Sequence, residues 1–256
     1  MKMVNMIFNI AYRSVKHVAP VCGANSCITY FNGKWLQLPL SIWPGFRMRY
    51  ESYIAQLLRQ NLKQGDMFID IGAHVGYWSL FAGKIVAPTG RVVACDASPP
   101  VFEHLSEASR YCSAVKAYNI GLGSKDAVSE FFAQGVASSA SFLREVTEIN
   151  EALNPGRAIT STLVQMRTLD SLLGELDQVP SVIKVDVEGY ELEVLKGAKH
   201  TLDKHSCIWI VEVHPPQLAL SGGTDEAVQE TLAASGYSST IVDRNPNSLY
   251  TIVARK

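Results

Sequence analysis

The amino-acid sequence predicts an α/β fold in which a mostly parallel β-sheet carries helices on both faces. From about residue 50 onward, short apolar segments of strand length alternate with segments of helical periodicity, an order typical of β-α-β units. The strand segments are almost wholly apolar, as expected for parallel strands that are buried on both sides. Two final strand segments, 237–243 and 248–254, flank a polar turn and predict an antiparallel C-terminal edge.

Local patterns place the individual elements in order. Apolar side chains at helical spacing predict a helix at 50–62, and Ser98 followed by Pro99 is typical of the start of another. Strands are expected at 67–71, 91–95, 114–120, 182–187 and 207–213. Further helices are expected at 77–86, 190–202 and 224–234.

Two stretches break this rhythm. Residues up to about 45 contain several glycines and prolines and are expected to be irregular, so we assign 1–48 to an N-terminal extension or cap and 49–256 to the main domain. The segment 134–164 is rich in Ser, Thr, Ala and Asn. We interpret it as an insertion over the carboxyl edge of the sheet, in the position of a lid.

Composition excludes several classes of function. The chain has 23 Lys and Arg against 24 Asp and Glu, a balance that gives no electrostatic footprint for nucleic acid. No apolar run reaches the roughly 18 residues that cross a bilayer. The five cysteines show no CxxC spacing, and the N-terminus resembles no secretion signal. We therefore interpret the protein as cytoplasmic.

The clearest chemical signal is the turn at residues 70–76, which runs from Asp70 to Gly76 between a strand and a helix. Gly72 permits a tight turn and close approach of a ligand, and the helix start attracts an anionic group. The dinucleotide fingerprint needs further glycines where this chain has His74 and Tyr77, and no Walker-type lysine follows. The turn therefore suits a ligand without a pyrophosphate, such as S-adenosylmethionine.

A second signal is Asp96, at the end of the next strand. A carboxylate in that position accepts both ribose hydroxyls of an adenosine. The alternative is an acidic residue that only complements the helix beginning after Ser98. The order and spacing of turn and carboxylate favour the ribose role.

With these motifs in place, the chain resembles the FkbM family of S-adenosylmethionine-dependent methyltransferases. The resemblance extends over about residues 50 to 215 and rests on six segments in order: 65–77, 90–99, 119–123, 167–170, 183–189 and 211–215. It implies the class I methyltransferase fold, which is Rossmann-like, and transfer of a methyl group from S-adenosylmethionine, usually to oxygen. His74 stands where the family usually has Asn, which leaves its side-chain role open.

The resemblance also implies a set of cofactor-binding residues. Glu51 matches a Tyr-Glu pair of the family and is expected near the amino group of the cofactor, with a solvated helix face as the alternative. Asn119, Ile120 and Gly121 are expected beside the adenine. The full predicted set is Glu51, Asp70, Gly72, Ala73, His74, Gly76, Tyr77, Asp96, Ala97, Asn119, Ile120, Gly121 and Asp186.

The catalytic hypotheses concern acids and a histidine at two strand ends. Asp186 is expected to face the sulfonium as base, metal ligand or cofactor contact, and Glu188 is either catalytic or a partner of a helix start. His214 is the hypothesised general base, with a surface histidine as the alternative. Asp186 and Glu212 could hold Mg²⁺, but the sequence shows no dedicated ligand cluster, so a metal is not favoured.

These observations predict an O-methyltransferase that acts on a hydroxyl of a sugar, glycolipid or natural product. The expected partner is a small-molecule or glycan acceptor, and a homo-oligomer is left open. Two alternatives are a nicotinamide-dependent oxidoreductase with an irregular glycine turn and a non-catalytic adenosine-binding module. The acceptor itself does not follow from the motifs.

Overall fold

A computed structural model describes residues 25–46, 48–135, 140–153, 158–244 and 249–256. Its centre is a seven-stranded sheet in the order β11-β12-β10-β9-β3-β4-β5. The strands β3 (Met67–Ile71), β4 (Arg91–Cys95), β5 (Val115–Tyr118), β9 (Val182–Val185) and β10 (Ile208–Val213) run parallel. The predicted α/β class with a mostly parallel sheet is therefore confirmed.

The C-terminal antiparallel pair is also present, with one detail that the sequence pattern does not carry. β12 (Tyr250–Arg255) pairs antiparallel with β10 on one side and with β11 (Ser238–Arg244) on the other. The last strand thus lies inside the sheet, and β11 forms the edge. Residues of β12 are buried up to Ala254, whereas every residue of β11 is exposed.

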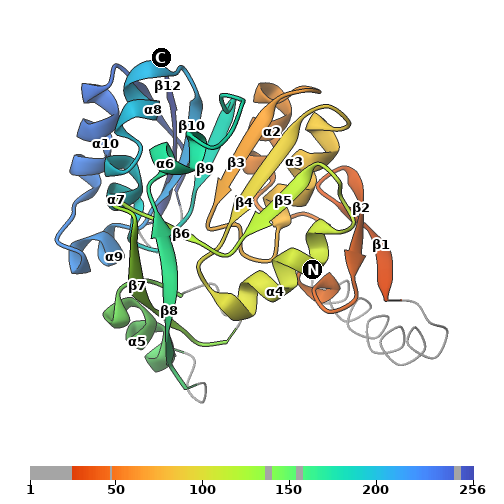
Figure 1. Ribbon diagram of the computed structural model, residues 1–256, viewed down its shortest axis with the longest axis horizontal. Helices are drawn as coiled ribbons and strands as arrows, with labels where there is room; N and C mark the ends of the chain where they lie inside the picture. The colour runs from red at the N-terminus through yellow and green to blue at the C-terminus, as the bar shows by residue number, and fades with distance from the viewer. Residues whose placement is uncertain (1–24, 47, 136–139, 154–157, 245–248) are drawn as a thin grey trace.

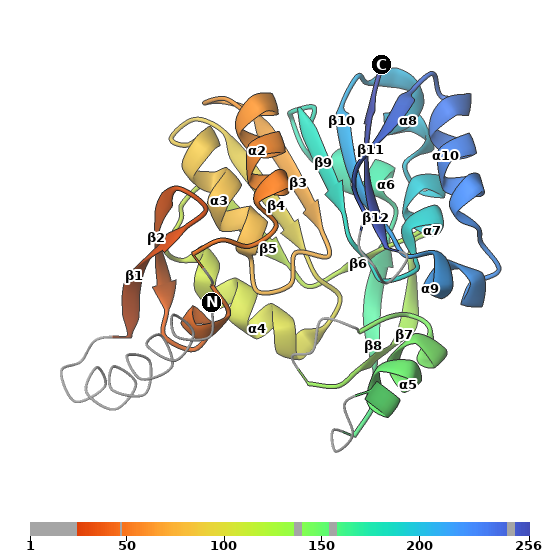
Figure 2. The same ribbon diagram turned by 180° about the vertical axis from the view of Figure 1, so that it is seen from behind.

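Helices cover both faces of the central sheet (Figures 1 and 2). One face packs against α2 (Ser52–Asn61), α3 (Tyr77–Val86) and α4 (Pro99–Ser109), and the other against α6 (Leu169–Leu173), α7 (Glu191–Lys196), α8 (Lys199–Lys204) and α10 (Asp225–Ala234). A further helix, α9 (Pro215–Leu220), follows β10. No helix among the described residues is long and apolar enough to cross a membrane.

The strand order reverses between β3 and β9. From β3 the chain builds outward to β4 and β5, and it later returns to place β9 and β10 on the opposite side. In open α/β sheets, ligands bind at such a reversal, beyond the carboxyl ends of the strands. The topology therefore places the predicted glycine turn, which follows β3, at the usual ligand position.

The described part of the N-terminal extension is a β-hairpin, which corrects the expectation of an irregular segment. β1 (Ser26–Phe31) and β2 (Lys34–Pro39) pair antiparallel around Asn32 and Gly33, which have φ of 45° and 88°. Asn-Gly is the preferred two-residue hairpin turn because both positions need positive φ. Phe31 anchors the hairpin on the main domain through ring contacts with Phe81 and Trp78.

The predicted insertion at 134–164 belongs to a second, smaller sheet. This sheet has the strand order β6 (Gly121–Leu122), β8 (Thr160–Arg167) and β7 (Ala127–Ala133), and α5 (Arg144–Leu153) lies next to it. The short 3₁₀ helix η1 (Trp43–Gly45) is not part of this unit and follows the hairpin. The small sheet and α5 project from one end of the central sheet (Figure 1). Phe131, Ala133 and Val164 form a small apolar cluster with Ala97, which ties this unit to the end of β4.

The helix expected at 190–202 is divided into α7 and α8. Asp170 explains the division, because its carboxylate accepts the backbone N–H groups of His200 and Thr201 at 2.7 and 2.9 Å and so caps the start of α8. The carbonyl of Gly197 accepts the backbone N–H of Asp170 at 3.1 Å instead of continuing the helix. A distant carboxylate therefore overrides a continuous helical pattern.

The turn after β3 makes a very close approach to β9. The amides of Gly72 and Ala73 both donate to the carbonyl of Cys95 at 3.0 Å, which joins the turn to β4. Gly72 has φ of 75°, and a Cβ there would lie 1.8 Å from the carbonyl oxygen of Asp186. Only glycine fits this position, because both the backbone angle and the space exclude a side chain.

We expect Gly72→Ala to destabilise the protein far more than Gly222→Ala. The two glycines have nearly equal φ of 75° and 74°, so each alanine carries a similar backbone strain of about 1–3 kcal/mol. Only the alanine at Gly72 would also meet backbone atoms, since a Cβ at Gly222 finds nothing within 4 Å. Urea unfolding of both variants measures the difference, and equal losses of stability would contradict the close approach.

Candidate functional site

A pocket with about 680 Å³ of empty space opens at the carboxyl ends of β3, β4 and β9. Residues 140–142 of the predicted lid segment also line it. Eight of the predicted site residues line the pocket: Gly72, His74, Asp96, Ala97, Ile120, Gly121, Asp186 and Glu188. The other predicted residues are not among its lining: Glu51, Asp70, Ala73, Gly76, Tyr77, Asn119, Glu212 and His214.

Asp96 is held in a fixed orientation by two backbone groups. Its Oδ2 accepts the amide of His74 at 2.8 Å, and its Oδ1 accepts the amide of Ser98 at 2.9 Å. Burial raises the pKa of Asp96 to about 6, although both hydrogen bonds act in the opposite direction. Each carboxylate oxygen keeps a second lone pair, so the group can still accept two hydroxyls from a ligand.

His74 reaches Asp96 through its backbone. Its φ of 50° lies in the left-handed region, and its backbone amide donates to the carboxylate of Asp96. The imidazole ring stacks on Tyr77 with 6.0 Å between ring centroids. Asparagine is enriched at such angles, so the replacement of the family's usual Asn by His keeps the backbone role.

One end of the pocket is apolar and aromatic. Ile120, Val101 and Phe142 line it, and Phe142 contacts the rings of Phe131 and Tyr190 at 5.0 and 5.1 Å between centroids. Asn119 is not part of the lining, because its Nδ2 donates to the carbonyl groups of Asp96 and Ala97. Sequence reasoning did not single out Phe142, although it stands out as an aromatic residue in a segment of small polar ones.

Another part of the pocket lining is acidic and includes Asp186, which pairs with a buried lysine. Lys184 is 2% exposed, and its Nζ lies 2.9 Å from Oδ2 of Asp186. Burial lowers the pKa of Lys184, but the charges of Asp186 and Asp70 outweigh this effect and hold it above its ordinary value. Sequence reasoning assigned no role to Lys184, because a lysine within an apolar strand gives no direct sign of its partners.

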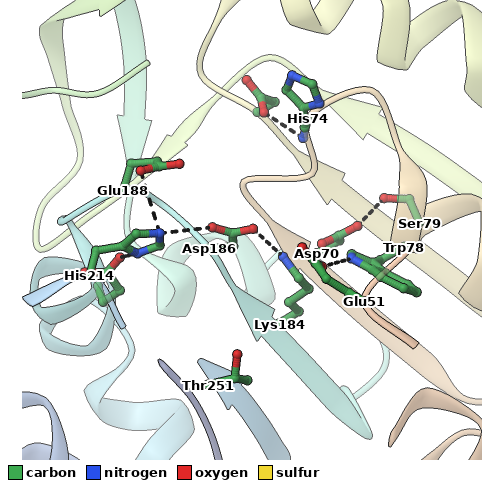
Figure 3. A network of polar contacts seen from close by, with 12 residues as sticks. Glu51, Asp70, His74, Trp78, Ser79, Lys184, Asp186, Glu188, His214 and Thr251 are labelled. Atoms are coloured by element: carbon green, nitrogen blue, oxygen red, sulfur yellow. Dashed lines mark hydrogen bonds and ion pairs between the residues drawn. The ribbon is translucent and has the colours of Figure 1, made fainter. Parts of the chain in front are cut away.

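Asp70 lies beneath this pair and is also buried. It accepts a hydrogen bond from the hydroxyl of Ser79, and burial raises its pKa against the effect of the nearby Lys184. Figure 3 shows Asp70, Lys184 and Asp186 in one continuous polar row. The structure therefore places Asp70 in the framework of the site, while Asp186 is the member that reaches the pocket.

Glu51 approaches the same row from the start of α2. Its Oε2 accepts the indole N–H of Trp78 at 3.3 Å, and its backbone has φ of 37°. Burial raises the pKa of Glu51, and the charge of Lys184 opposes this rise. Glu51 is therefore not on a solvated helix face, and it faces the lysine side of the row (Figure 3).

His214 is 2% exposed and surrounded by carboxylates, which excludes the alternative of a surface histidine. Its Nδ1 lies 2.7 Å from Oε1 of Glu191, and its Nε2 lies 3.7 Å from Glu188 and 3.9 Å from Asp186. Burial lowers the pKa of His214, but the hydrogen bond and charge of Glu191 raise it to about 10. The imidazole is then charged near neutral pH.

A protonated imidazole has no lone pair with which to accept a proton, so the raised pKa weighs against His214 as the general base, and that role stays a hypothesis. Glu188, the other acid of the catalytic hypotheses, lines the pocket, and its Oε2 lies 3.7 Å from Nε2 of His214. Burial raises the pKa of Glu188 to about 7, despite the opposing charge of His214. Its φ of 50° is a strained value for a residue with a side chain, as is common at functional sites.

Glu212 lies beside Asp186 on the neighbouring strand. Val211 of β10 pairs with Val185 of β9, so the next residue on each strand is Glu212 and Asp186. The charge of Asp186, followed by burial, raises the pKa of Glu212 to about 8. Asp186 itself has a lowered pKa, because Lys184 and His214 together outweigh the effect of burial. One ligand atom each of Asp186, Glu212 and His214 lie within 4.8 Å of one another, so these side chains could hold a metal ion.

The reversed parallel sheet, the glycine turn and the carboxylate on the next strand together define a class I methyltransferase. Residues 70–239 match the family described as the methyltransferase FkbM domain, and the chain belongs to this family of S-adenosylmethionine-dependent enzymes. The resemblance inferred from the six sequence segments is thereby confirmed.

Similar proteins and structures also carry methyltransferase names, in agreement with this assignment. The hexuronic acid methyltransferase AglP of Haloferax volcanii is 27% identical over 216 residues, which cover 84% of this chain and 81% of that protein. Methyltransferase 1 of Beauveria bassiana is 28% identical over 146 residues, 52% of this chain and 58% of that one. The FkbM methyltransferase structure from Methylobacillus flagellatus KT has a TM-score of 0.51 at 15% identity and shows the same fold. That match covers 85% of this chain, which spans about half (53%) of the other protein.

In protein freed of metal ions by EDTA, Glu191→Gln is expected to lower the pKa of His214 from about 10. The variant keeps a hydrogen-bonding group but removes the buried charge, and loss of one nearby charge typically shifts a pKa by about 1–3 pH units. Titration of the imidazole by NMR measures the shift. Glu193→Gln, on the same helix but directed to Lys196 and Ser124, is the matched control. An unchanged pKa in Glu191→Gln would contradict the assigned cause.

Proposed function

We propose that the protein transfers a methyl group from S-adenosylmethionine to a hydroxyl oxygen of a sugar, glycolipid or natural product. The observation that carries this proposal is the arrangement of one pocket between two carboxylate groups. Asp96 is oriented at one side beside the glycine turn, and Asp186 and Glu188 line the other. The hexuronic acid methyltransferase among the relatives supports an acceptor of the sugar class.

The nucleoside of the cofactor fits the part of the pocket beside the glycine turn. Asp96 accepts the ribose hydroxyls, and the adenine lies between Ile120 and Phe142. The positive sulfonium then lies toward Asp186 and Glu188, where a cation is favoured by nearby negative charge. Residues 140–142 cover this space, and we assign the segment 134–164 the role of a lid that excludes water.

The methyl transfer requires little covalent chemistry from the protein. The acceptor oxygen attacks the methyl carbon as the bond from carbon to sulfur breaks, and S-adenosylhomocysteine leaves. The sulfonium is already activated, so alignment of the two reactants provides most of the acceleration. The proton of the hydroxyl passes to the carboxylate of Glu188, which lines the pocket at the sulfonium side.

The proposed function is tested by calorimetry and by a transfer assay on the same preparation. Heat of binding with S-adenosylhomocysteine, together with a labelled methyl group on a glycoside or polyol acceptor, supports it. Carbon NMR of the product distinguishes a methyl group on oxygen from one on nitrogen. Binding of NADH without binding of S-adenosylhomocysteine would instead favour the oxidoreductase, and saturable cofactor binding without any transfer would favour a non-catalytic module.

We expect Asp96→Asn to weaken the binding of S-adenosylhomocysteine by about 10- to 100-fold, as is typical when a hydrogen bond loses its charged acceptor. The exposed Glu103→Gln on α4 removes the same charge without touching the pocket, and its affinity should be unchanged. Calorimetry at constant salt concentration gives both values.

The same carboxylate predicts a pH dependence of cofactor binding. The pKa of Asp96 is about 6, and only its ionised form accepts both ribose hydroxyls. The affinity of the wild-type protein should therefore be full above the pKa and fall as the pH is lowered through about 6. Asp96→Asn should show no such fall, and a variant with the wild-type pH profile would contradict the role of Asp96.

A further inference from the structure

Three side chains from two adjacent strands converge on one point beside the pocket. Asp186 follows β9, Glu212 lies in β10, and His214 follows β10 directly. Asp186 and Glu212 are neighbours across the strands, and His214 lies two residues beyond Glu212 on the same side of the chain. Their ligand atoms lie within 4.8 Å of one another.

We propose that Asp186, Glu212 and His214 bind one divalent cation of the Mg²⁺ or Mn²⁺ class beside the cofactor pocket. Two carboxylates and one imidazole provide oxygen and nitrogen ligands that Mn²⁺ accepts, and Mg²⁺ is commonly held by one or two carboxylates. The metal site needs no assumption about the reaction. Its role toward an acceptor, described below, rests on the proposed methyl transfer to a hydroxyl.

A residue outside the cluster orients the imidazole of His214 for metal binding. Its Nδ1 is bonded to Glu191 at 2.7 Å, and Glu191 is itself wholly buried and accepts the amide of Gly189 at 3.0 Å. A carboxylate on one ring nitrogen is the usual way in which a metal-binding histidine is oriented, with its other nitrogen directed at the ion. The ring is 2% exposed, so this orientation is fixed by packing as well.

The distances leave room for an ion between the ligand atoms. Nε2 of His214 lies 3.9 Å from Oδ1 of Asp186, too far for a hydrogen bond. Octahedral ligands at about 2.1 Å from an ion are about 3.0 to 4.2 Å apart, so this pair fits and Glu212 needs only a small adjustment. Oδ2 of Asp186 is occupied by Lys184 at 2.9 Å, which leaves Oδ1 for the ion.

A further carboxylate also lies next to this point. Oε2 of Glu188 is 3.7 Å from Nε2 of His214, beside the ligand atoms of Asp186 and Glu212. An ion at Nε2 would take the place of the imidazole proton. The simpler alternative is a network of ion pairs that is complete without a metal. The two arrangements are distinguished by whether the protein binds a divalent cation from solution.

An ion held by three protein groups keeps open positions on the side of the pocket, because Asp186 is part of the pocket lining. Those positions suit neighbouring hydroxyls of a sugar or other polyol, and a divalent cation makes a bound hydroxyl more acidic. Glu188 remains next to the cluster to receive the proton. The inferred acceptor class is therefore a polyol with adjacent hydroxyls.

The test uses EDTA-treated full-length protein and Mn²⁺ alone as the probe, followed by electron paramagnetic resonance. We expect one Mn²⁺ per chain, with Mg²⁺ competing for the same site. Glu191→Gln should weaken Mn²⁺ binding by about 10- to 100-fold, the loss typical of a residue that orients a metal ligand. Glu212→Gln removes a ligand itself and should weaken Mn²⁺ binding at least as much. Asp243→Asn, an exposed carboxylate on β11, should bind Mn²⁺ as the wild type does.

Two results would overturn the proposal: a wild-type protein that binds no Mn²⁺ at millimolar concentration, or equal affinities in Glu212→Gln and Asp243→Asn. The wild-type result stands even where a variant fails to fold, and circular dichroism identifies such a variant. Calorimetry with S-adenosylhomocysteine in EDTA separates this outcome from the proposed function. If S-adenosylhomocysteine binds with heat but Mn²⁺ does not bind, only the metal site is refuted. If Mn²⁺ binds but S-adenosylhomocysteine gives no heat, only the cofactor assignment is refuted.

Discussion

The site depends on one buried ammonium group. Lys184 is almost inaccessible to solvent, and it neutralises acids that come from three neighbouring strands of the sheet, Asp70, Asp186 and Glu212. Without that charge, several carboxylates would be buried together without compensation, an arrangement that costs several kcal/mol for each ion. The lysine thus permits a concentration of negative charge at the end of a parallel sheet. Under the proposed function, that concentration of negative charge favours the positively charged sulfonium of the cofactor.

Much of the fold is predictable from the sequence, because its elements are encoded locally. The helix at 77–86 and the strands at 67–71 and 91–95 were predicted with the bounds that the structure shows. The hairpin was missed although Asn32 and Gly33 carry a clear turn signal, since the surrounding glycines and prolines suggested irregular chain. The division of α7 from α8 was not predictable, because it depends on Asp170, which is 30 residues away from His200 in sequence.

The site residues also divide into those that are encoded locally and those that depend on distant partners. Residues of the glycine turn and Asp96 follow from spacing alone, and the pocket contains eight of the predicted positions. Phe142, Lys184 and Glu191 were missed because their importance lies in partners that only the fold brings near. The raised pKa of His214 does not follow from the sequence for the same reason. An isolated histidine titrates near neutral pH, but three surrounding acids change which form it adopts.

The floor and the roof of the pocket come from different sheets. The floor is built by the ends of β3, β4 and β9, whereas the roof residues 140–142 connect parts of the small sheet that contains β7 and β8. Apolar side chains around Ala97 form one contact between the two units, and Ser141 and Phe142 form another with Glu188 and Tyr190. Under the proposed function, exchange or remodelling of the roof changes the acceptor preference while the donor-binding floor stays intact. Chimaeras that graft a relative's roof onto this floor would measure that change of acceptor preference.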